Sequence, residues 1–381
     1  ENGNINLAKE SFKNAISFKP KYAEAYNGLG LTLEKNGEFL SAIKNYEKAL
    51  KINPNYSEVY FNLGNIFKKN GDFELSIINY KKAIKLKQNY SEAYCNLGNT
   101  KKDLGEINSA IHYYKKALKA NPEDFETMWN LHGVSGSIDE ATNWLINCLK
   151  AKKNCLKAKL TLSALKYLRN DKIDFNNLIT TKYKSHPFMR SFVWFFQLPK
   201  VPKLFFDKFS FFNYAVKKSD RDRPFYEFGV WKGTSFKYLM KNFKKGFGFD
   251  TFTGLPERWY NEVAGTYSSN GVIPNIKGGE FIVGRFQETL PKFFKNKRPL
   301  ASLINFDADL YSSTFCALEN CKNIIDKNTI IIFDEFLMSD NWEEDEYKAL
   351  NDFCYNNNFS YEVIAVSFFS KQVAVKIAIN S

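Results

Sequence analysis

The stretch AEAYNGLGLTLEKNGEFLSAIKNYEKALKINPNY, residues 23–56, decides the fold of the first third of this 381-residue chain. It aligns without gaps on residues 57–90 and again on residues 91–124, so the sequence repeats with a period of 34 residues. Residues 2–22 align on the second half of such a unit. Self-similarity at this period is typical of stacked helical hairpins, so the sequence predicts an N-terminal α-solenoid.

Small and large residues recur where paired helices must fit together. Close approach of two helices is predicted at Gly30, Gly64 and Gly98, and the end of each first helix at Gly37, Gly71 and Gly105. Tyrosines fill the gaps between helices, at Tyr26, Tyr60 and Tyr94 and at Tyr46, Tyr80 and Tyr114, while Pro20, Pro54 and Pro122 stop second helices. This pattern resembles the tetratricopeptide repeat over about residues 1–124, and residues 125–151 resemble a shortened capping unit.

The resemblance implies a partner for the array. Tetratricopeptide arrays present a concave surface to a peptide or another protein, so a protein or peptide partner is expected. The alternative is an array that only stiffens or dimerises the molecule. Neither the ligand nor the oligomeric state can be read from the sequence.

Composition narrows the class of protein. Apolar residues make up 44% of the chain and charged residues 25%, with no uninterrupted apolar run of about 20 residues, so a soluble protein without a transmembrane segment is expected. The six cysteines are scattered without CxxC pairs, and only three histidines are present. Zinc fingers and dense disulfide scaffolds are therefore not expected, and a reducing, cytoplasmic compartment is predicted.

The positive charge of the chain is concentrated in its middle. The net charge is +13, and residues 151–223 alone contain 17 Lys and Arg against 5 acidic residues. We interpret residues 152–223 as a basic helical connector between residues 1–151 and residues 224–381, with Pro199 and Pro202 breaking any long helix. Such a segment can contact nucleic acid or anionic lipid, but a solvated helical face with a packed underside is favoured, and nucleic acid is not an expected partner.

From residue 224 onward, short β-rich runs alternate with helical stretches. The expected strands are 225–230, 246–250, 280–286, 300–306, 329–335, 360–369 and 372–379. The expected helices lie near 232–243, 287–296, 313–326 and 342–357. The last two strands follow each other through a tight turn. The pattern predicts a Rossmann-like, seven-stranded α/β fold: a parallel sheet covered on both faces and closed by an antiparallel last strand.

Acidic residues and glycines cluster at the predicted carboxyl ends of the strands, where α/β sheets bind ligands. The first run continues as Glu227-Phe-Gly229-Val-Trp-Lys-Gly233-Thr234, and the second ends in Asp250. Later runs end in Asp307-Ala-Asp309 and Asp334-Glu335. Taken singly, the glycine loop is compatible with a structural turn and Asp250 with capping of a loop. Together they predict a site, because buried strands that end in carboxylates need a cation or hydrogen-bond donors.

The motifs YEFGVWKGTS (226–235), GFDTFTGLP (248–256), GRFQETLP (284–291), FDADLYSST (306–314) and IIFDEF (331–336) resemble the macrocin O-methyltransferase group of class I S-adenosylmethionine-dependent enzymes. The resemblance covers about residues 224–378. It implies methylation of a sugar hydroxyl, or of a glycosylated small molecule, with the help of Mg²⁺. Glu227, Gly229 and Gly233 would line the methionine end of the cofactor, Asp250 would bind ribose, and the loop Phe252–Pro256 would border adenosine.

The implied cofactor-binding residues are Glu227, Gly229, Gly233, Thr234, Asp250, Thr251 and Phe252. The implied metal ligands are Asp307, Asp334 and Glu335, with Asp309 close by. Relatives commonly carry Asp-Asp or Asp-Asn where this chain has Asp334-Glu335, and the glycine loop lacks the middle glycine of the commoner pattern. Asp307 or Asp309 is the predicted catalytic base. No histidine follows His186, so a histidine base is excluded within residues 224–381.

Two other function classes stay open. The DxD pattern also holds the metal of nucleotide-sugar glycosyltransferases, and the C-terminal fold could persist as a non-catalytic interaction scaffold. The long segment 252–278 is predicted to be a lid over the acceptor, with Trp259 and Tyr260 packing against a sugar ring. A disordered surface excursion is the alternative for that segment.

Overall fold

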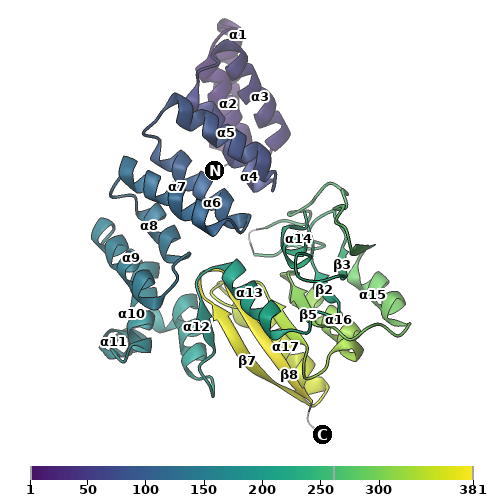
Figure 1. The fold of residues 1–381 in the computed structure, drawn as a ribbon. Coiled ribbons are helices and arrows are strands. Elements are labelled where there is room, and N and C mark those ends of the chain that lie inside the picture. Colours follow the sequence, from purple (N-terminus) through teal and green to yellow (C-terminus); the bar gives the residue numbers. More distant parts are fainter. Residues whose placement is uncertain (1, 261, 380–381) are drawn as a thin grey trace. The chain divides into compact units, whose positions relative to one another are not determined.

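The computed structural model describes residues 2–260 and 262–379 (Figure 1). Contacts divide the chain into two compact units, Glu1–Leu131 and His132–Ser381. This division differs from the three predicted domains, 1–151, 152–223 and 224–381. The basic segment 152–223 does not stand apart as a connector, because it falls inside the second unit.

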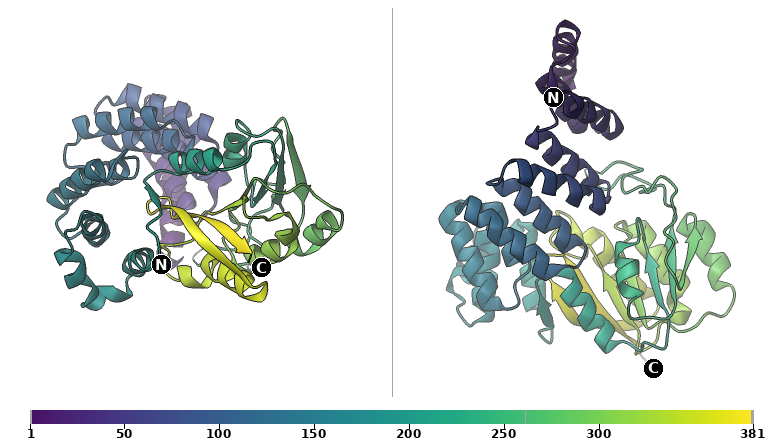
Figure 2. Two further views of the ribbon diagram at one scale, coloured as in Figure 1. Left: turned by 60° about the horizontal axis from the view of Figure 1, so that its bottom comes forward. Right: turned by 45° about the horizontal axis from the view of Figure 1, so that its top comes forward.

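Helical hairpins build the first unit, as the 34-residue period predicts (Figure 2). Gly37, Gly71 and Gly105 have φ angles of 79°, 71° and 78°, a left-handed conformation that ends the first helix of each repeat. The helices are α1 (Asn2–Phe18), α2 (Ala23–Lys35), α3 (Phe39–Ile52), α4 (Ser57–Lys69), α5 (Phe73–Leu86), α6 (Ser91–Asp103), α7 (Ile107–Ala120) and α8 (Phe125–His132).

A tyrosine on the second helix of each repeat fills the space above a glycine on the first. A Cβ atom on Gly64 would lie 2.5 Å from the ring of Tyr80, and the same contact recurs between Gly30 and Tyr46 and between Gly98 and Tyr114. The three tyrosines are fully buried. The Tyr80 hydroxyl still finds a partner, since it donates to Asn65 Oδ1 at 2.7 Å. The predicted pairing of small and large residues is therefore confirmed.

Replacing Gly64 with valine should destabilise the repeat array. The added side chain would overlap a buried ring in a close-packed interface, and overpacking of this kind costs about 3 kcal/mol of unfolding free energy. Chemical denaturation followed by far-ultraviolet circular dichroism measures the loss. Lys81→Val, which places the same side chain at an exposed position in the middle of α5, is the control without a clash and should cost less than about 1 kcal/mol. Equal effects of the two substitutions would contradict the packing argument.

The second unit is built on one mixed, eight-stranded sheet in the order β1-β7-β8-β6-β5-β2-β3-β4. Only β8 runs antiparallel to its neighbours, β6 and β7. The strands are β1 (Lys203–Phe205), β2 (Phe225–Phe228), β3 (Gly246–Asp250), β4 (Gly279–Val283), β5 (Leu303–Phe306), β6 (Ile330–Phe333), β7 (Phe359–Ser367) and β8 (Gln372–Ile379). All seven predicted runs form strands, and the terminal hairpin is present.

The predicted strand number is wrong by one, because β1 adds an eighth strand at the edge. Its three residues pair in parallel with β7. They follow Pro202, in a segment whose prolines and aromatic residues gave no alternating pattern. A strand this short depends on its neighbour for its conformation, so periodicity could not reveal it.

Helices cover both faces of the sheet (Figure 1). On one face Phe225 of β2 packs against Phe236 of α14, with ring centroids 4.7 Å apart. On the other face Phe249 of β3 packs against Phe293 of α15 at 5.0 Å. The helices of this unit are α9 (Ile138–Ala151), α10 (Leu156–Leu168), α11 (Ile173–Ile179), α12 (Pro187–Phe196), α13 (Lys208–Lys218), α14 (Thr234–Leu239), α15 (Phe286–Phe294), α16 (Tyr311–Cys321) and α17 (Glu346–Asn356), with 3₁₀ turns η1 (Lys182–Ser185), η2 (Lys322–Ile324) and η3 (Trp342–Glu344).

The basic segment packs its apolar side into the same core as the sheet. Leu160 of α10 and Phe192 and Phe195 of α12 belong to one buried cluster with strand residues. Several of its cations pair with carboxylates of the same unit, for example Arg190 Nε with Glu343 Oε1 at 2.6 Å. This matches the favoured interpretation of a helical face with a packed underside. None of the described helices is long and apolar enough to cross a lipid bilayer.

Candidate functional site

Four stacked phenylalanine rings lie on neighbouring strands, one residue before the candidate site residues. Neighbouring rings lie 4.8, 5.1 and 5.2 Å apart between centroids and are nearly parallel. The rings belong to Phe249 of β3, Phe228 of β2, Phe306 of β5 and Phe333 of β6, which are in register across the sheet. The next residues along these strands are Asp250, Gly229, Asp307 and Asp334. The register therefore brings four predicted site residues into one row at the carboxyl ends of the strands.

Strand order reverses in the middle of this row. β3 and β4 lie on one side of β2, whereas β5 and β6 lie on the other. Open α/β sheets bind ligands in the crevice at such a reversal. Gly229 and Asp307 meet there so closely that a Cβ atom on Gly229 would lie 1.9 Å from the carbonyl oxygen of Asp307. Gly229 also has a φ angle of 89°, so both sterics and conformation require glycine at this position.

Asp250 ties together the two turns that follow β2 and β3. Its Oδ2 accepts hydrogen bonds from the N–H groups of Val230 at 2.7 Å and Trp231 at 2.8 Å. Its Oδ1 accepts one from the N–H of Phe252 at 2.6 Å. A carboxylate has about four lone-pair sites, so one stays available to a ligand. Asp250 thus has a structural role, and its predicted contact with ribose stays a prediction.

The other predicted cofactor residues lie around these turns. Gly233 has a φ angle of 75° and directly precedes Thr234, the first residue of α14. Thr251 Oγ1 donates to the carbonyl of Gly254 at 3.2 Å. The Phe252 side chain is fully buried, so its ring packs inside the unit and does not line an open cavity.

Glu227 carries a buried carboxyl group with an unpaired oxygen. The residue is 1% exposed and lies on β2 between Gly248 of β3 and Asn305 of β5. Among the described residues, Glu227 Oε2 has no hydrogen-bond partner. Burial, together with the nearby charge of Asp307, raises the pKa of Glu227 well above its ordinary value. An unpaired buried carboxyl group is costly, and this one is therefore a candidate for binding a cationic or hydrogen-bonding ligand.

Asp307 and Asp309 form an acidic pair at the end of β5. Burial and the neighbouring Asp334 carboxylate raise the pKa of Asp307 to about 7. Burial and the charge of Asp307 raise the pKa of Asp309 well above its ordinary value. No hydrogen bond or ion pair of the Asp309 carboxylate is found within the described part of the chain. A carboxyl group with a raised pKa is suited to take up a proton near neutral pH, as the predicted base must.

Two lysines form ion pairs with the three predicted metal ligands. Lys208 Nζ, at the start of α13, lies 2.9 Å from Asp334 Oδ1 and 3.7 Å from Asp307 Oδ2. Lys371 Nζ, in the turn before β8, lies 2.6 Å from Glu335 Oε2. Burial alone would lower the pKa of Lys208, but the carboxylates of Asp334 and Asp307 outweigh it and raise that pKa.

This arrangement does not fit a metal ion. Asp334 Oδ1 accepts hydrogen bonds from both Lys208 and the buried amide of Gln372, which fills its lone pairs. Glu335 Oε2 accepts from Ser339 Oγ at 3.3 Å as well as from Lys371. Within residues 2–260 and 262–379, no group of three or more His, Cys, Asp or Glu side chains is placed to hold a metal ion.

The long segment 252–278 is held by its own hydrogen bonds and by contacts with the site; residue 261 lies outside the described residues. Leu255 N donates to Thr266 O at 2.8 Å, and Gly271 N donates to Phe252 O at 2.9 Å. The indole N–H of Trp231 donates to Ser268 O at 3.3 Å, which joins the segment to the glycine loop. The alternative, a disordered surface excursion, is therefore not what the described residues of this segment form. Its role as a lid stays a prediction.

The two aromatic residues predicted to pack on a sugar ring are half-buried and already engaged. The rings of Trp259 and Tyr260 lie 5.2 Å apart, and the Tyr260 hydroxyl donates to Asp345 Oδ2. Tyr267, which is 42% exposed, is another aromatic side chain of this segment. Partial burial and the charges of Glu262, Asp309, Glu335 and Asp307 raise the pKa of Tyr267 to about 12.

Sequence reasoning missed several side chains that the fold brings to this site. They are Lys208, Tyr267, Glu346, Lys371 and Gln372. Glu346 is fully buried, and its Oε2 accepts from the N–H of Glu335 at 3.1 Å. One signal was present in the sequence: Lys208 directly follows the N-cap residue Asp207, although a cation at a helix N-terminus opposes the helix dipole.

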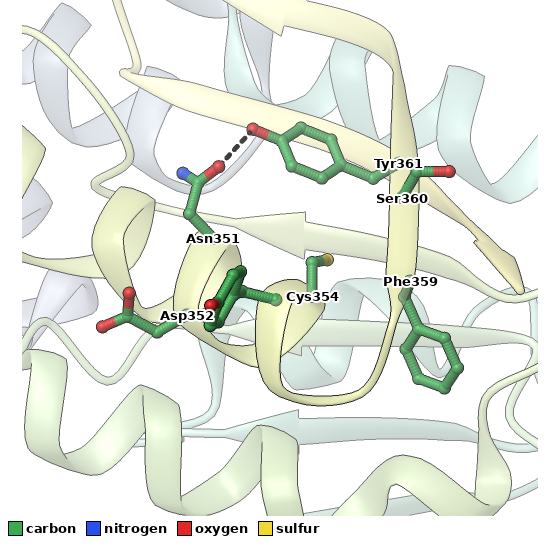
Figure 3. Close-up of a pocket in the computed structure, with 7 residues that line it drawn as sticks. Asn351, Asp352, Cys354, Phe359, Ser360 and Tyr361 are labelled. Atoms are coloured by element: carbon green, nitrogen blue, oxygen red, sulfur yellow. Dashed lines mark hydrogen bonds between the residues drawn. The ribbon is translucent and has the colours of Figure 1, made fainter. Parts of the chain in front are cut away.

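A hollow lies where the end of α17 meets the start of β7 (Figure 3). It is lined by Asn351, Asp352, Cys354 and Tyr355 of α17 and by Phe359, Ser360 and Tyr361 of β7. The Tyr361 hydroxyl donates to Asn351 Oδ1 at 3.3 Å. β7 begins here, whereas the predicted site lies at the carboxyl ends of the parallel strands, so this hollow contains none of the predicted site residues.

Comparison with known proteins identifies the repeats. The family model described as TPR repeat matches residues 1–37, 35–71 and 64–105, and the model described as tetratricopeptide repeat matches residues 91–124. The N-terminal part of the chain therefore consists of tetratricopeptide repeats, which confirms the prediction for this region. No protein with a curated description matches the chain.

Several solved structures are similar over part of the chain. MamA is 24% identical, with 41% of this chain and 93% of that chain covered and a TM-score of 0.37. YrrB, described as a TPR protein with an unusual peptide-binding site, is 18% identical, with 48% and 98% covered and a TM-score of 0.39. PilF of Pseudomonas aeruginosa is 19% identical, with 51% and 90% covered and a TM-score of 0.45.

Proposed function

We propose that the second unit is an S-adenosylmethionine-dependent O-methyltransferase of the Rossmann-like class, acting on a hydroxyl group of a sugar or glycosylated small molecule. The observation that carries the proposal is the row of Asp250, Gly229, Asp307 and Asp334 at the reversal of strand order. One end of this row suits a nucleoside-bearing cofactor and the other end an acceptor. The antiparallel last strand β8 also supports this fold class.

The cofactor half of the site would be formed by the turns after β2 and β3. Bound S-adenosylmethionine would supply the methyl group together with a positively charged sulfonium and ammonium. Glu227 would meet that positive charge with its unpaired Oε2, which explains why a buried carboxyl group is kept there. The positive φ angles of Gly229 and Gly233 shape the turn that would face the cofactor, and Asp250 would offer its remaining lone pair to the ribose hydroxyls.

The acceptor half would lie at the end of β5. Methyl transfer is chiefly a positioning task, because the attacking oxygen must stand in line with the bond that breaks. Asp309, whose carboxylate is unpaired within the described residues, would take the proton of the acceptor hydroxyl. The Mg²⁺ implied by the resemblance has no fitting ligand set here, so no step of the proposal passes through a metal ion.

The repeats would hold a protein or peptide partner. Their stacked helical hairpins form the kind of extended surface on which such arrays bind other chains. We propose that this partner delivers or localises the acceptor.

Isothermal titration of the full chain tests the function. We expect micromolar binding of S-adenosylhomocysteine and no binding of UDP or GDP, because the glycine turn and Glu227 suit the adenosyl sulfonium. Asp250→Asn should weaken the affinity about tenfold or more, since it perturbs both turns at once. Asp222→Asn, the same change on an exposed side chain, is the control.

Two results would contradict the proposal. Binding of UDP or GDP in place of S-adenosylhomocysteine would favour the glycosyltransferase. Binding of none of the three ligands would favour the interaction scaffold.

A further inference from the structure

A lysine of this chain places a positive charge beside the acidic residues at the ends of β5 and β6. Lys208 Nζ lies between two predicted metal ligands, 2.9 Å from Asp334 Oδ1 and 3.7 Å from Asp307 Oδ2. The three side chains are only 26%, 15% and 31% exposed, so water screens their interaction incompletely. A cation at this point is therefore built into the fold.

We propose that the ammonium group of Lys208 is the resident cation of this site and takes the place of a divalent metal ion. This inference goes beyond the proposed function and does not depend on it, because it concerns only what neutralises Asp307 and Asp334. Lys208 is a positioning residue: it fixes the two carboxylates and so the end of β5 that carries Asp309.

The capped N-terminus of α13 fixes the position of Lys208. Asp207 caps α13 by accepting from the N–H groups of Phe209 at 3.0 Å and Ser210 at 2.8 Å, which makes Lys208 the first residue of the helix. A lysine there is unfavourable for the helix dipole, so nearby carboxylates must compensate for it. The ring of Phe212, one turn along, lies 5.5 Å from Lys208 Nζ and supports the side chain.

Other side chains also bind the predicted metal ligands Asp334 and Glu335. Asp334 Oδ1 accepts from the amide of Gln372, a fully buried residue of β8, in addition to Lys208. Glu335, whose place in the sequence suggests a second metal-binding carboxylate, pairs with Lys371 at 2.6 Å. A divalent ion would have to displace two ammonium groups and one amide to gain three carboxylate ligands. Lysines cannot coordinate it in their charged form, so this chain should not bind the ion in the way the resemblance implies.

Manganese binding gives a readout that is independent of catalysis. The electron paramagnetic resonance signal of free Mn²⁺ should be undiminished by the wild-type full chain, and its melting temperature should not change in millimolar Mg²⁺ or Mn²⁺. Lys208→Met, which keeps an unbranched side chain one atom shorter but removes its charge, should lower the melting temperature by about 4 °C or more, because it leaves two close carboxylates uncompensated. Mn²⁺ should restore much of that loss by binding to the site that the variant opens.

Matched variants isolate the charge. Lys218→Met, at the other end of α13, should neither lower the melting temperature in this way nor gain Mn²⁺ binding. Lys208→Arg should keep the wild-type insensitivity to Mn²⁺. Stoichiometric Mn²⁺ binding by the wild-type chain would overturn the proposal, and this measurement does not require Lys208→Met to fold. A Lys208→Met variant that folds and loses no stability would also overturn it. Neither result would bear on whether S-adenosylhomocysteine binds.

Discussion

Gly229→Ala is expected to unfold or severely destabilise the second unit, with a loss of about 4 kcal/mol in unfolding free energy. The added Cβ would lie 1.9 Å from the carbonyl oxygen of Asp307 and 2.6 Å from its carbonyl carbon. Both are backbone atoms of a buried strand end, so no side-chain rotation can relieve the clash. The φ angle of 89° adds strain, because alanine rarely adopts it.

Gly271→Ala separates steric clash from backbone strain. Gly271 also has a positive φ angle, 75°, but a Cβ there would meet nothing within 4 Å. We expect it to cost only about 1 kcal/mol. Chemical denaturation monitored by tryptophan fluorescence measures both variants. A loss at Gly229 no greater than that at Gly271 would mean that β2 and β5 do not approach as closely as the site requires.

The repeats and the strands could be predicted because each depends on residues close in sequence. A helical hairpin needs Gly64 and Tyr80 at a fixed spacing, and the period of the chain displays that spacing directly. A buried parallel strand needs a short apolar run, and the runs ending in Phe228 and Phe306 satisfy this. Register then brings Gly229, Asp307 and Asp334, which directly follow their strands, into one row with Asp250, the last residue of β3.

The charge state of the site could not be predicted, because its cations come from distant parts of the chain. Lys208 lies in a segment whose excess of lysines suggested an ordinary basic surface, and its place at the start of a helix does not tell which carboxylates it meets. It reaches the site because α13 packs against β1 and β7 and touches α14, where Phe209 meets Tyr238 with ring centroids 4.5 Å apart. The sequence therefore located the carboxylates but not the groups that neutralise them.

Glu227→Gln is expected to stabilise the second unit while it weakens binding of S-adenosylhomocysteine or S-adenosylmethionine about 30-fold or more. The substitution removes a buried, partly unpaired carboxyl group and keeps its shape, so the melting temperature should rise by about 2–4 °C at pH 8. Binding suffers because the amide offers no negative charge to the ammonium and sulfonium of the cofactor.

The gain in stability should depend on pH, and the direction follows from the raised pKa of Glu227. The folded chain holds this proton more tightly than the unfolded chain, whose glutamate titrates near pH 4.3. Wild-type stability is therefore undiminished below that pH and falls as pH rises toward the folded pKa, whereas glutamine does not titrate. The melting temperatures of the two proteins should coincide near about pH 4 and diverge by pH 8. A constant difference across this range, or unaltered cofactor affinity, would show that Glu227 is not the buried ligand-binding carboxyl group of this site.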